Sequence, residues 1–290
     1  MRRILVVLLA LLGGCAPRLA AGPPRVETLE AAGLRFHLVY PPEEAASARL
    51  VAEALPEAVA RASRYAALRV PVTIAIHGSQ EALEAAAGRP GRGWLRAWAR
   101  FATIELRSPR AWSLFGAGRD EVVALLAHEL AHCAMYQAAG ADRAPASSDP
   151  PLWFREGLAS VSAGEGAKRI GLPALRAFYL EARGTGPAAG DPLTDPEPIL
   201  ARDPDLVYGA AHHAFSFLVA RYGEARVRVL LRHMAGGRPF PAAFREATGL
   251  EAAAFEAEFR RYVVWRGWAG AAGYSSPRRT TEAMAQSLSP

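Results

Sequence analysis

Cysteine and lysine are scarce in this sequence. Its 290 residues include two cysteines, Cys15 and Cys133, and one lysine, Lys168. The 34 basic residues are otherwise all arginine, and the accompanying abundance of alanine indicates a bias in the coding DNA. The arginines are scattered and form no dense basic run, which argues against a nucleic-acid-binding protein. We therefore expect no nucleic-acid partner.

Charge of either sign is moderate, and the sequence contains no internal repeat. Charged residues make up 21% of the chain and hydrophobic residues 51%. This balance is typical of a globular protein and excludes an intrinsically disordered chain. A chain of this length forms one large domain or two modest ones, with enough apolar material for a core.

The N-terminal segment has the pattern of a signal peptide. A positive start, residues 1–3, precedes an apolar run, residues 4–12, which is too short to span a bilayer core of about 30 Å. The run ends in Leu-Gly-Gly-Cys15, which resembles the lipobox of bacterial lipoproteins, where the cysteine is diacylated and becomes the new N-terminus. Ordinary cleavage beside an accidental cysteine is the alternative, and the scarcity of cysteine favours the lipobox.

The lipobox predicts a protein of the cell envelope, anchored by lipid outside the cytoplasm. We expect residues 1–14 to be removed, Cys15 to carry the lipid that binds a membrane, and residues 15–32 to act as a tether. A lipidated Cys15 leaves Cys133 without a partner for a disulfide within the chain. Cys133 is then expected to be a small buried hydrophobic residue and not a catalytic thiol.

The hydrophobic pattern predicts an α+β fold. A small mixed or antiparallel sheet, packed on a helix at 120–139, is expected within residues 33–165, followed by a helical part at 166–268 and a flexible tail at 269–290. The expected strands are 34–40, 70–77 and 98–106, whose clearest part is 102–106. A long loop is expected at 184–204. The other expected helices are 43–68, 80–87, 152–163, 173–182, 208–222, 224–235, 241–248 and 250–265.

The expected helix at 120–139 contains the pattern H-E-x-x-H at residues 128–132. Histidines four residues apart lie one above the other on a helix, so His128 and His132 can bind one metal ion. Glu129 lies about 100° round the helix, where it reaches a metal-bound water. Two unconnected histidines on a surface helix are the alternative, but the apolar neighbours indicate burial, where unpaired histidines are costly.

A catalytic zinc site needs a third protein ligand. A histidine six residues after His132 is excluded, because that position is Ala138. Glu156 follows His132 by 24 residues, in a mostly apolar helix that can present it to the same ion after the chain reverses. A glutamate that is solvated or paired with Arg155 is the alternative. We predict one Zn²⁺ bound by His128, His132 and Glu156.

Both motifs together carry a resemblance. The HELAH segment and residues 151–159, Pro-Leu-Trp-Phe-Arg-Glu-Gly-Leu-Ala, resemble the gluzincin zinc peptidases, in particular the bacterial peptidase MA-like domains related to thermolysin. In the family a tryptophan directly follows the proline, whereas here Leu152 lies between Pro151 and Trp153. The family's E-G-x-A pattern is intact at residues 156–159. Residues 208–223 and 240–250 are similar to the family's later helices, so the resemblance covers about residues 33–265.

The resemblance implies a zincin-like fold and a zinc metallopeptidase that hydrolyses peptide or protein substrates. Zinc lowers the pKa of its water towards about 7, and Glu129 takes the water's proton and passes it to the leaving amine. Tyr208 resembles the family's transition-state tyrosine, and His212, on the same helix face, is a second candidate for stabilising the oxyanion. The strand at 102–106 is expected to be an edge that pairs with an extended peptide.

Two other functions stay open. One is a zinc amidase that acts on cell-wall peptides. The other is a catalytically silent binding or assembly lipoprotein that keeps the fold. The intact Glu129 argues against silence, because a purely structural zinc site has no need of this carboxylate.

Overall fold

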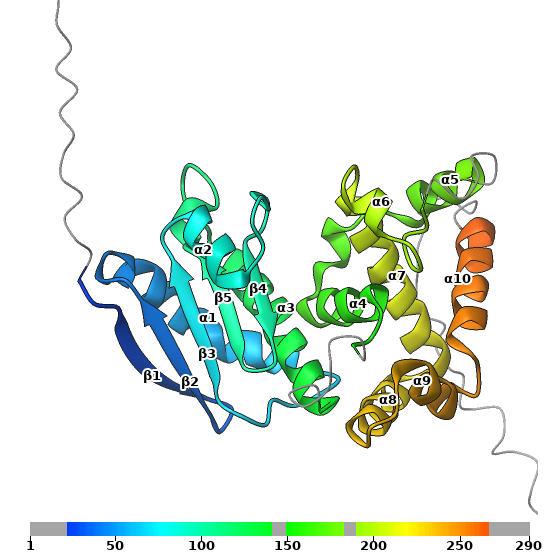
Figure 1. The fold of residues 1–290 in the computed structure, drawn as a ribbon, viewed down its shortest axis with the longest axis horizontal. Helices are drawn as coiled ribbons and strands as arrows, with labels where there is room; N and C mark the ends of the chain where they lie inside the picture. Colours follow the sequence, from blue (N-terminus) through cyan, green and yellow to red (C-terminus); the bar gives the residue numbers. More distant parts are fainter. Residues whose placement is uncertain (1–21, 141–148, 183–189, 267–290) are drawn as a thin grey trace, which may run out of the picture.

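The computed structural model describes residues 22–140, 149–182 and 190–266, and Figure 1 shows them as a sheet with its helices beside a purely helical part. The fold is α+β, as expected. The predicted signal peptide, Cys15 and the predicted tail at 269–290 lie outside the described residues. Among the described helices, none is both long and apolar enough to cross a membrane.

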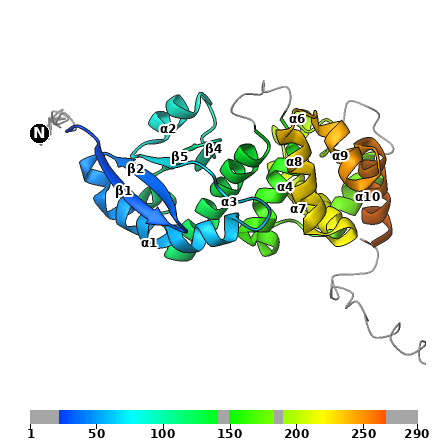
Figure 2. The ribbon, with the colours of Figure 1, turned by 90° about the horizontal axis from the view of Figure 1, so that it is seen from below.

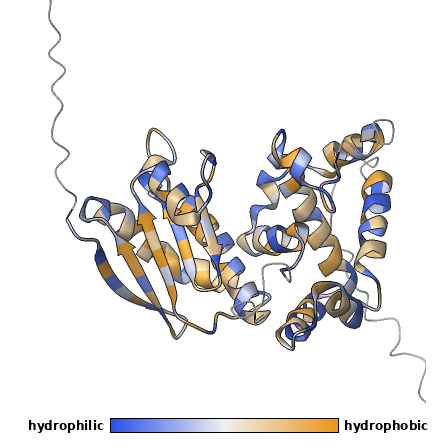
Figure 3. Cartoon of the chain, viewed as in Figure 1, coloured by the Kyte–Doolittle hydropathy of each residue, from blue (hydrophilic) through white to orange (hydrophobic). Residues whose placement is uncertain are grey.

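A mixed sheet of five strands organises the first part. Its order is β1 (Arg25–Ala31), β2 (Leu34–Tyr40), β3 (Val72–His77), β5 (Thr103–Arg107) and β4 (Ala97–Arg100). The three inner strands are parallel to one another, and the edge strands β1 and β4 are antiparallel to their neighbours. Alternate residues of the inner strands are buried, and Figure 3 shows the apolar character of these strands.

The sheet differs from its prediction in two places. Residues 25–31, which we expected in the tether, form β1, because Ala32 and Gly33 adopt positive φ and close a two-residue hairpin onto β2. The single strand expected at 98–106 is a hairpin instead, with its turn at Phe101, whose φ is +52°. The segment 102–106 therefore belongs to an inner strand, and the edge beside it is β4.

Two long helices cover one face of the sheet. α1 (Ala45–Ala62) and α3 (Arg119–Ala138) pack side by side there, and Figure 2 shows α2 (Gln80–Ala87) on the opposite side. α3 is buried almost throughout, because it lies between the sheet and the helical part. It begins after Gly118, whose N–H donates to the Glu121 carboxylate at 3.1 Å, so Asp120 is not the N-cap that we expected.

The helical part surrounds an aromatic cluster. Its helices are α4 (Leu152–Ala163), α5 (Leu172–Ala182), α6 (Glu197–Leu200), α7 (Pro204–Tyr222), α8 (Glu224–Ala235), α9 (Phe240–Thr248) and α10 (Ala252–Arg266). The Trp153 ring contacts Phe154, Phe240, Phe244 and Phe255, and its Nε1 donates to Glu256 at 2.9 Å. The loop expected at 184–204 contains α6, and α7 begins four residues earlier than we expected, where Asp203 caps it.

α4 joins the two parts by packing between α3 and α7. Gly157 lets α7 approach the backbone of α4 closely: a Cβ at this position would lie 2.3 Å from the Ala211 carbonyl oxygen and 2.5 Å from the Phe215 Cβ. Only glycine allows this contact. The close approach positions the first turns of α7 next to the residues of α3 and α4 described below.

Candidate metal centre

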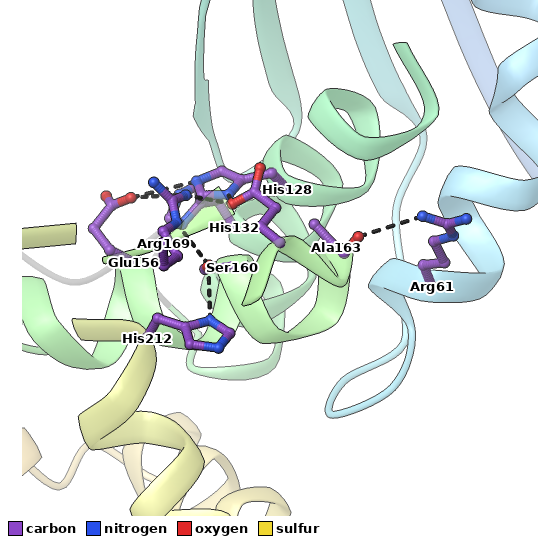
Figure 4. Close-up of polar contacts among 9 residues, drawn as sticks. Arg61, His128, His132, Glu156, Ser160, Ala163, Arg169 and His212 are labelled. Carbon is purple, nitrogen blue, oxygen red and sulfur yellow. Dashed lines mark hydrogen bonds and ion pairs between the residues drawn. The ribbon is translucent and has the colours of Figure 1, made fainter. Parts of the chain in front are cut away.

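The three predicted ligands lie together at the contact between α3 and α4. His128 and His132 project from α3, and Glu156 projects from α4 (Figure 4). Oε2 of Glu156 is 3.3 Å from Nε2 of His128 and 3.7 Å from Nε2 of His132. Donor atoms of the three residues all lie within 4.8 Å of one another. The alternative partner of Glu156, Arg155, is engaged by Asp149 and by the Tyr136 hydroxyl.

The chemistry of this donor set fits zinc. Two imidazole nitrogens and one carboxylate oxygen form the ligand set of catalytic zinc sites of the His₂Glu type, which keep a fourth position for water. Imidazoles that bind a metal are neutral, and Glu165 is paired with Arg169, so a divalent cation would balance the two remaining carboxylates, Glu129 and Glu156.

Electrostatic interactions within the cluster reflect this balance. Burial alone would lower the pKa of His128, but the Glu156 and Glu165 carboxylates raise it to about 10. Burial alone would raise the pKa of Glu156, but the two histidines hold it well below its usual value. The carboxylate of Glu156 is therefore ionised, as a metal ligand must be.

Glu129 lies in the same buried pocket, but its pKa is shifted in the opposite direction from that of Glu156. It is only 6% exposed, and burial raises its pKa, an effect that the neighbouring histidines oppose. Its side chain lines the cavity in front of the cluster. A carboxylate whose pKa is shifted towards neutrality suits general-base work.

Glu165 contacts the ligand cluster, and the sequence analysis did not identify it. α4 ends at Gly164, whose φ of +75° turns the chain into a short 3₁₀ helix, Glu165–Lys168. This turn places Oε2 of Glu165 3.2 Å from Nδ1 of His128. A carboxylate on the second ring nitrogen fixes the orientation and tautomer of a metal-binding histidine. The only sequence signal is a helix-ending glycine before an acidic residue, which does not specify the contact.

A chain of polar contacts continues from Glu165. Arg169 pairs with Glu165, and its Nε donates to Oγ of Ser160 at 3.1 Å. Oγ of Ser160 lies 3.0 Å from Nδ1 of His212 (Figure 4). These contacts connect the metal cluster to α7 through buried groups, so each helps to hold the next in position.

The two candidate oxyanion donors differ in their surroundings. Tyr208 lines the cavity, with the Arg169 guanidinium 5.5 Å from its ring centroid, and burial raises the pKa of its hydroxyl, which stays protonated. His212 does not line this cavity and instead bonds to Ser160 of α4. Burial, His213 and Arg169 lower the pKa of His212 to about 4, so it is neutral. The structure brings Tyr208, and not His212, to the cavity.

The cavity has a volume of about 400 Å³ and is lined by residues of both parts of the molecule. β4 and the loop before it form one wall, α3 forms the floor, and α4, α6 and α7 form the other wall. This volume falls within the range of small-ligand sites and accommodates a few residues of an extended peptide.

Cys133 is buried, as expected for a small hydrophobic residue. Its Sγ is 3.9 Å from the carbonyl oxygen of Thr103, and burial raises the pKa of the thiol. A protonated thiol that faces the sheet takes no part in the cavity's chemistry.

Comparisons with known proteins give only distant likenesses. No family model matches the sequence, and a search of curated proteins found no match. An M1 zinc metallopeptidase from Deinococcus radiodurans aligns with a TM-score of 0.40 and 16% identity over 84% of this chain and 52% of its own. A mutant from the same organism, bound to the substrate Tyr-Ser-Ala, aligns with a TM-score of 0.41, 14% identity and the same coverage.

An aminopeptidase N family protein from Idiomarina loihiensis aligns with a TM-score of 0.40 and 13% identity over 81% of this chain and 46% of its own. The chain spans about half the length of the solved structures it matches. Likeness at this level carries no functional argument.

Proposed function

We propose that this protein is a zinc-dependent metallopeptidase. The observation that carries the proposal is the meeting of His128, His132 and Glu156 at the floor of a peptide-sized cavity, with the buried carboxylate of Glu129 beside them. When bound there, zinc supplies a Lewis acid that polarises a carbonyl and lowers the pKa of water towards about 7.

The chain's own residues supply the proton transfers and the positioning. The Glu129 carboxylate accepts a proton from the attacking water and delivers it to the leaving nitrogen of the peptide bond. The Tyr208 hydroxyl is protonated and donates a hydrogen bond to the oxyanion of the substrate. Glu165 holds the His128 ring through Nδ1, which leaves Nε2 free as the ligand.

β4 offers the substrate a free backbone edge. The Arg107 N–H donates to the Arg96 carbonyl at 2.8 Å, so alternate residues from Arg96 onward pair with β5. Ala97 and Ala99, between them, direct their backbone groups away from β5, and both residues line the cavity. Their small side chains leave room for an extended peptide to pair with this edge.

The proposal includes attachment to a membrane. A lipid on Cys15 would tether the enzyme to the cell envelope, outside the cytoplasm, through the segment before β1. Replacing Cys15 by serine should abolish labelling by radioactive palmitate and release the protein from the membrane fraction. A Cys15→Ser variant that still takes up the label would overturn the lipid anchor without affecting the proposed activity.

Metal content and peptide cleavage together test the enzymatic proposal. The Glu129→Gln variant should keep one zinc per chain and lose at least about 10²-fold in kcat, because only the base is removed. Glu156→Ala should lose zinc, because a ligand is removed. Glu53→Gln, on the exposed side of α1, is the matched control and should behave as the wild type. A fully active Glu129→Gln variant contradicts the mechanism.

The same experiment addresses the silent binding lipoprotein. A fourth protein ligand that closes the zinc site would favour that alternative, but within the described residues the cluster offers three ligands. A zinc-loaded protein that cleaves no bond in a broad peptide mixture would favour it. Cleavage restricted to cell-wall peptides, with linear protein-derived peptides left intact, would favour the amidase.

A further inference from the structure

Arginines line both walls of the cavity. Arg92 and Arg96 are exposed on the loop between α2 and β4, and Arg89 lies at the start of the same wall. Arg155 and Arg169 belong to the opposite wall. The walls differ in how these positive charges are neutralised.

The arginines of the helical wall are engaged by acidic groups. Arg169 pairs with Glu165, and Arg155 lies 3.7 Å from a carboxylate oxygen of Asp149. On the strand wall, Arg92 and Arg96 lie over aromatic rings instead, 5.8 Å from the centroid of Trp94 and 5.5 Å from that of Trp112. Among the residues that the structure describes, no carboxylate forms an ion pair with Arg92 or Arg96.

Three of the four acidic residues of the cavity lining do not offset this charge. Glu129, Glu156 and Glu165 belong to the metal cluster, where they balance the histidines and the cation that the cluster fits. Glu197, on α6, is the remaining acidic residue of the lining. Burial and the Glu156 and Glu129 carboxylates raise the pKa of the Tyr208 hydroxyl, and Arg169 and Arg92 oppose this rise more weakly. The positive charge without an acidic partner is therefore that of Arg92 and Arg96 on the strand wall.

We propose that the cavity selects peptides with a carboxylate side chain close to the scissile bond, and that Arg92 and Arg96 bind this group. The proposal rests on the proposed peptidase function. A guanidinium stacked on an indole is oriented yet keeps its N–H groups directed outward, and it can bind both oxygens of a carboxylate. A peptide paired with the β4 edge passes beside the loop that carries both arginines.

Matched peptides test this preference. A cleavage site found in a peptide mixture is resynthesised with Glu, Gln or Lys at each flanking position, and kcat/KM is measured for the full chain in detergent. At one or more positions, we expect kcat/KM for the Glu peptide to exceed that for the Gln peptide by about two- to fivefold for each arginine in contact. We expect kcat/KM for the Lys peptide to be lower than that for the Gln peptide. Raising the salt concentration should reduce the ratio, because exposed charges are screened.

Substitution identifies the residues responsible. The Arg92→Gln/Arg96→Gln double variant should reduce the Glu-to-Gln ratio to about one, whereas Arg226→Gln, an exposed arginine on α8, should leave it unchanged. Binding of the Glu peptide to the Glu129→Gln protein is measured by fluorescence anisotropy. When both arginines are replaced, its affinity should fall by the factor by which the wild type prefers Glu over Gln. This readout does not depend on turnover.

The outcomes separate the two proposals. A protein that cleaves peptides without preferring Glu overturns the acidic preference. A double variant that keeps the preference overturns the role of Arg92 and Arg96. Both outcomes leave the peptidase standing. A zinc-loaded protein that cleaves no peptide of any charge overturns the peptidase and the preference with it.

Discussion

The carboxylate of Glu165 lies 3.2 Å from Nδ1 of His128, on the ring nitrogen that does not face Glu156. In the proposed metal site, His128 is thereby held between the carboxylate of Glu156, which would bind the metal with it, and the carboxylate of Glu165, which would orient it. Glu156 belongs to α4 and Glu165 to the turn that follows it. One helix and its C-terminal turn therefore contact both ring nitrogens of the same imidazole.

Replacing Glu165 by glutamine should weaken zinc binding by roughly 10- to 100-fold, because the neutral amide fixes the His128 tautomer less firmly. Competition with a fluorescent zinc chelator measures the dissociation constant. Glu53→Gln is again the control, since it removes an equivalent charge from an exposed position on α1. An unchanged dissociation constant would show that the contact does not support the ligand.

Tyr208→Phe should lower kcat by roughly 10²- to 10³-fold while KM changes little, because the hydroxyl bonds to the oxyanion and not to the ground-state substrate. Zinc content should stay at one per chain. His212→Asn provides the comparison, because His212 bonds to Ser160 of α4 and lies outside the cavity lining. If His212→Asn lost as much kcat as Tyr208→Phe with its fold intact, the assignment of the donor would be wrong.

The free energy of unfolding should depend on pH through His212. Its folded pKa of about 4 lies below the ordinary value near 6.5, so between these two pH values the unfolded chain binds more protons than the folded one. Stability contributed by the neutral ring is therefore present above about pH 6.5 and is lost as the pH falls towards 4. Burial lowers the pKa of His213 too, which acts in the same direction.

Urea unfolding of the metal-free protein at pH 7.5 and pH 5 measures this dependence. The loss of stability between these values should be smaller in His212→Asn than in the wild type by on the order of 1–2 kcal/mol. Equal losses in the two proteins would show that His212 is not held neutral.

Gly157→Ala should destabilise the fold by at least about 1–3 kcal/mol, because its Cβ would overlap the backbone of α7. Gly93→Ala is the matched control: it has open space around its Cβ position and no positive φ, so its stability should equal or slightly exceed that of the wild type. Thermal unfolding compares the two. A wild-type melting temperature in Gly157→Ala would refute the close packing of α4 on α7.

Local spacing made much of the fold and the ligand cluster predictable. Helices 80–87, 152–163 and 224–235 and strand 34–40 are confirmed with the expected bounds. His128 and His132 come together through helix geometry alone, which needs no knowledge of the tertiary structure. Glu156 could be placed because it lies in an apolar helix that follows the motif helix after a reversal, and because its E-G-x-A pattern resembles that of the gluzincins.

Contacts that depend on pairing between distant segments could not be predicted in the same way. The edge position of β4 depends on a turn at Phe101, a residue type that rarely signals a turn. The contact of Glu165 with His128 depends on how α4 packs against α3, which no local pattern encodes. β1 did have a local signal, the glycine at position 33 between two alternating segments, and this signal was missed.

The bond from Trp153 to Glu256 joins residues 103 positions apart, one just before the proposed ligand Glu156 and the other near the start of the last described helix, α10. A ribosome must therefore complete nearly the whole chain before the aromatic cluster can close around α4 and fix Glu156 opposite the histidines. A nascent chain that stops before α10 has every ligand and lacks the packing that holds one of them in place. Zinc capture is thus expected to follow synthesis, as one of the last steps in the maturation of the protein.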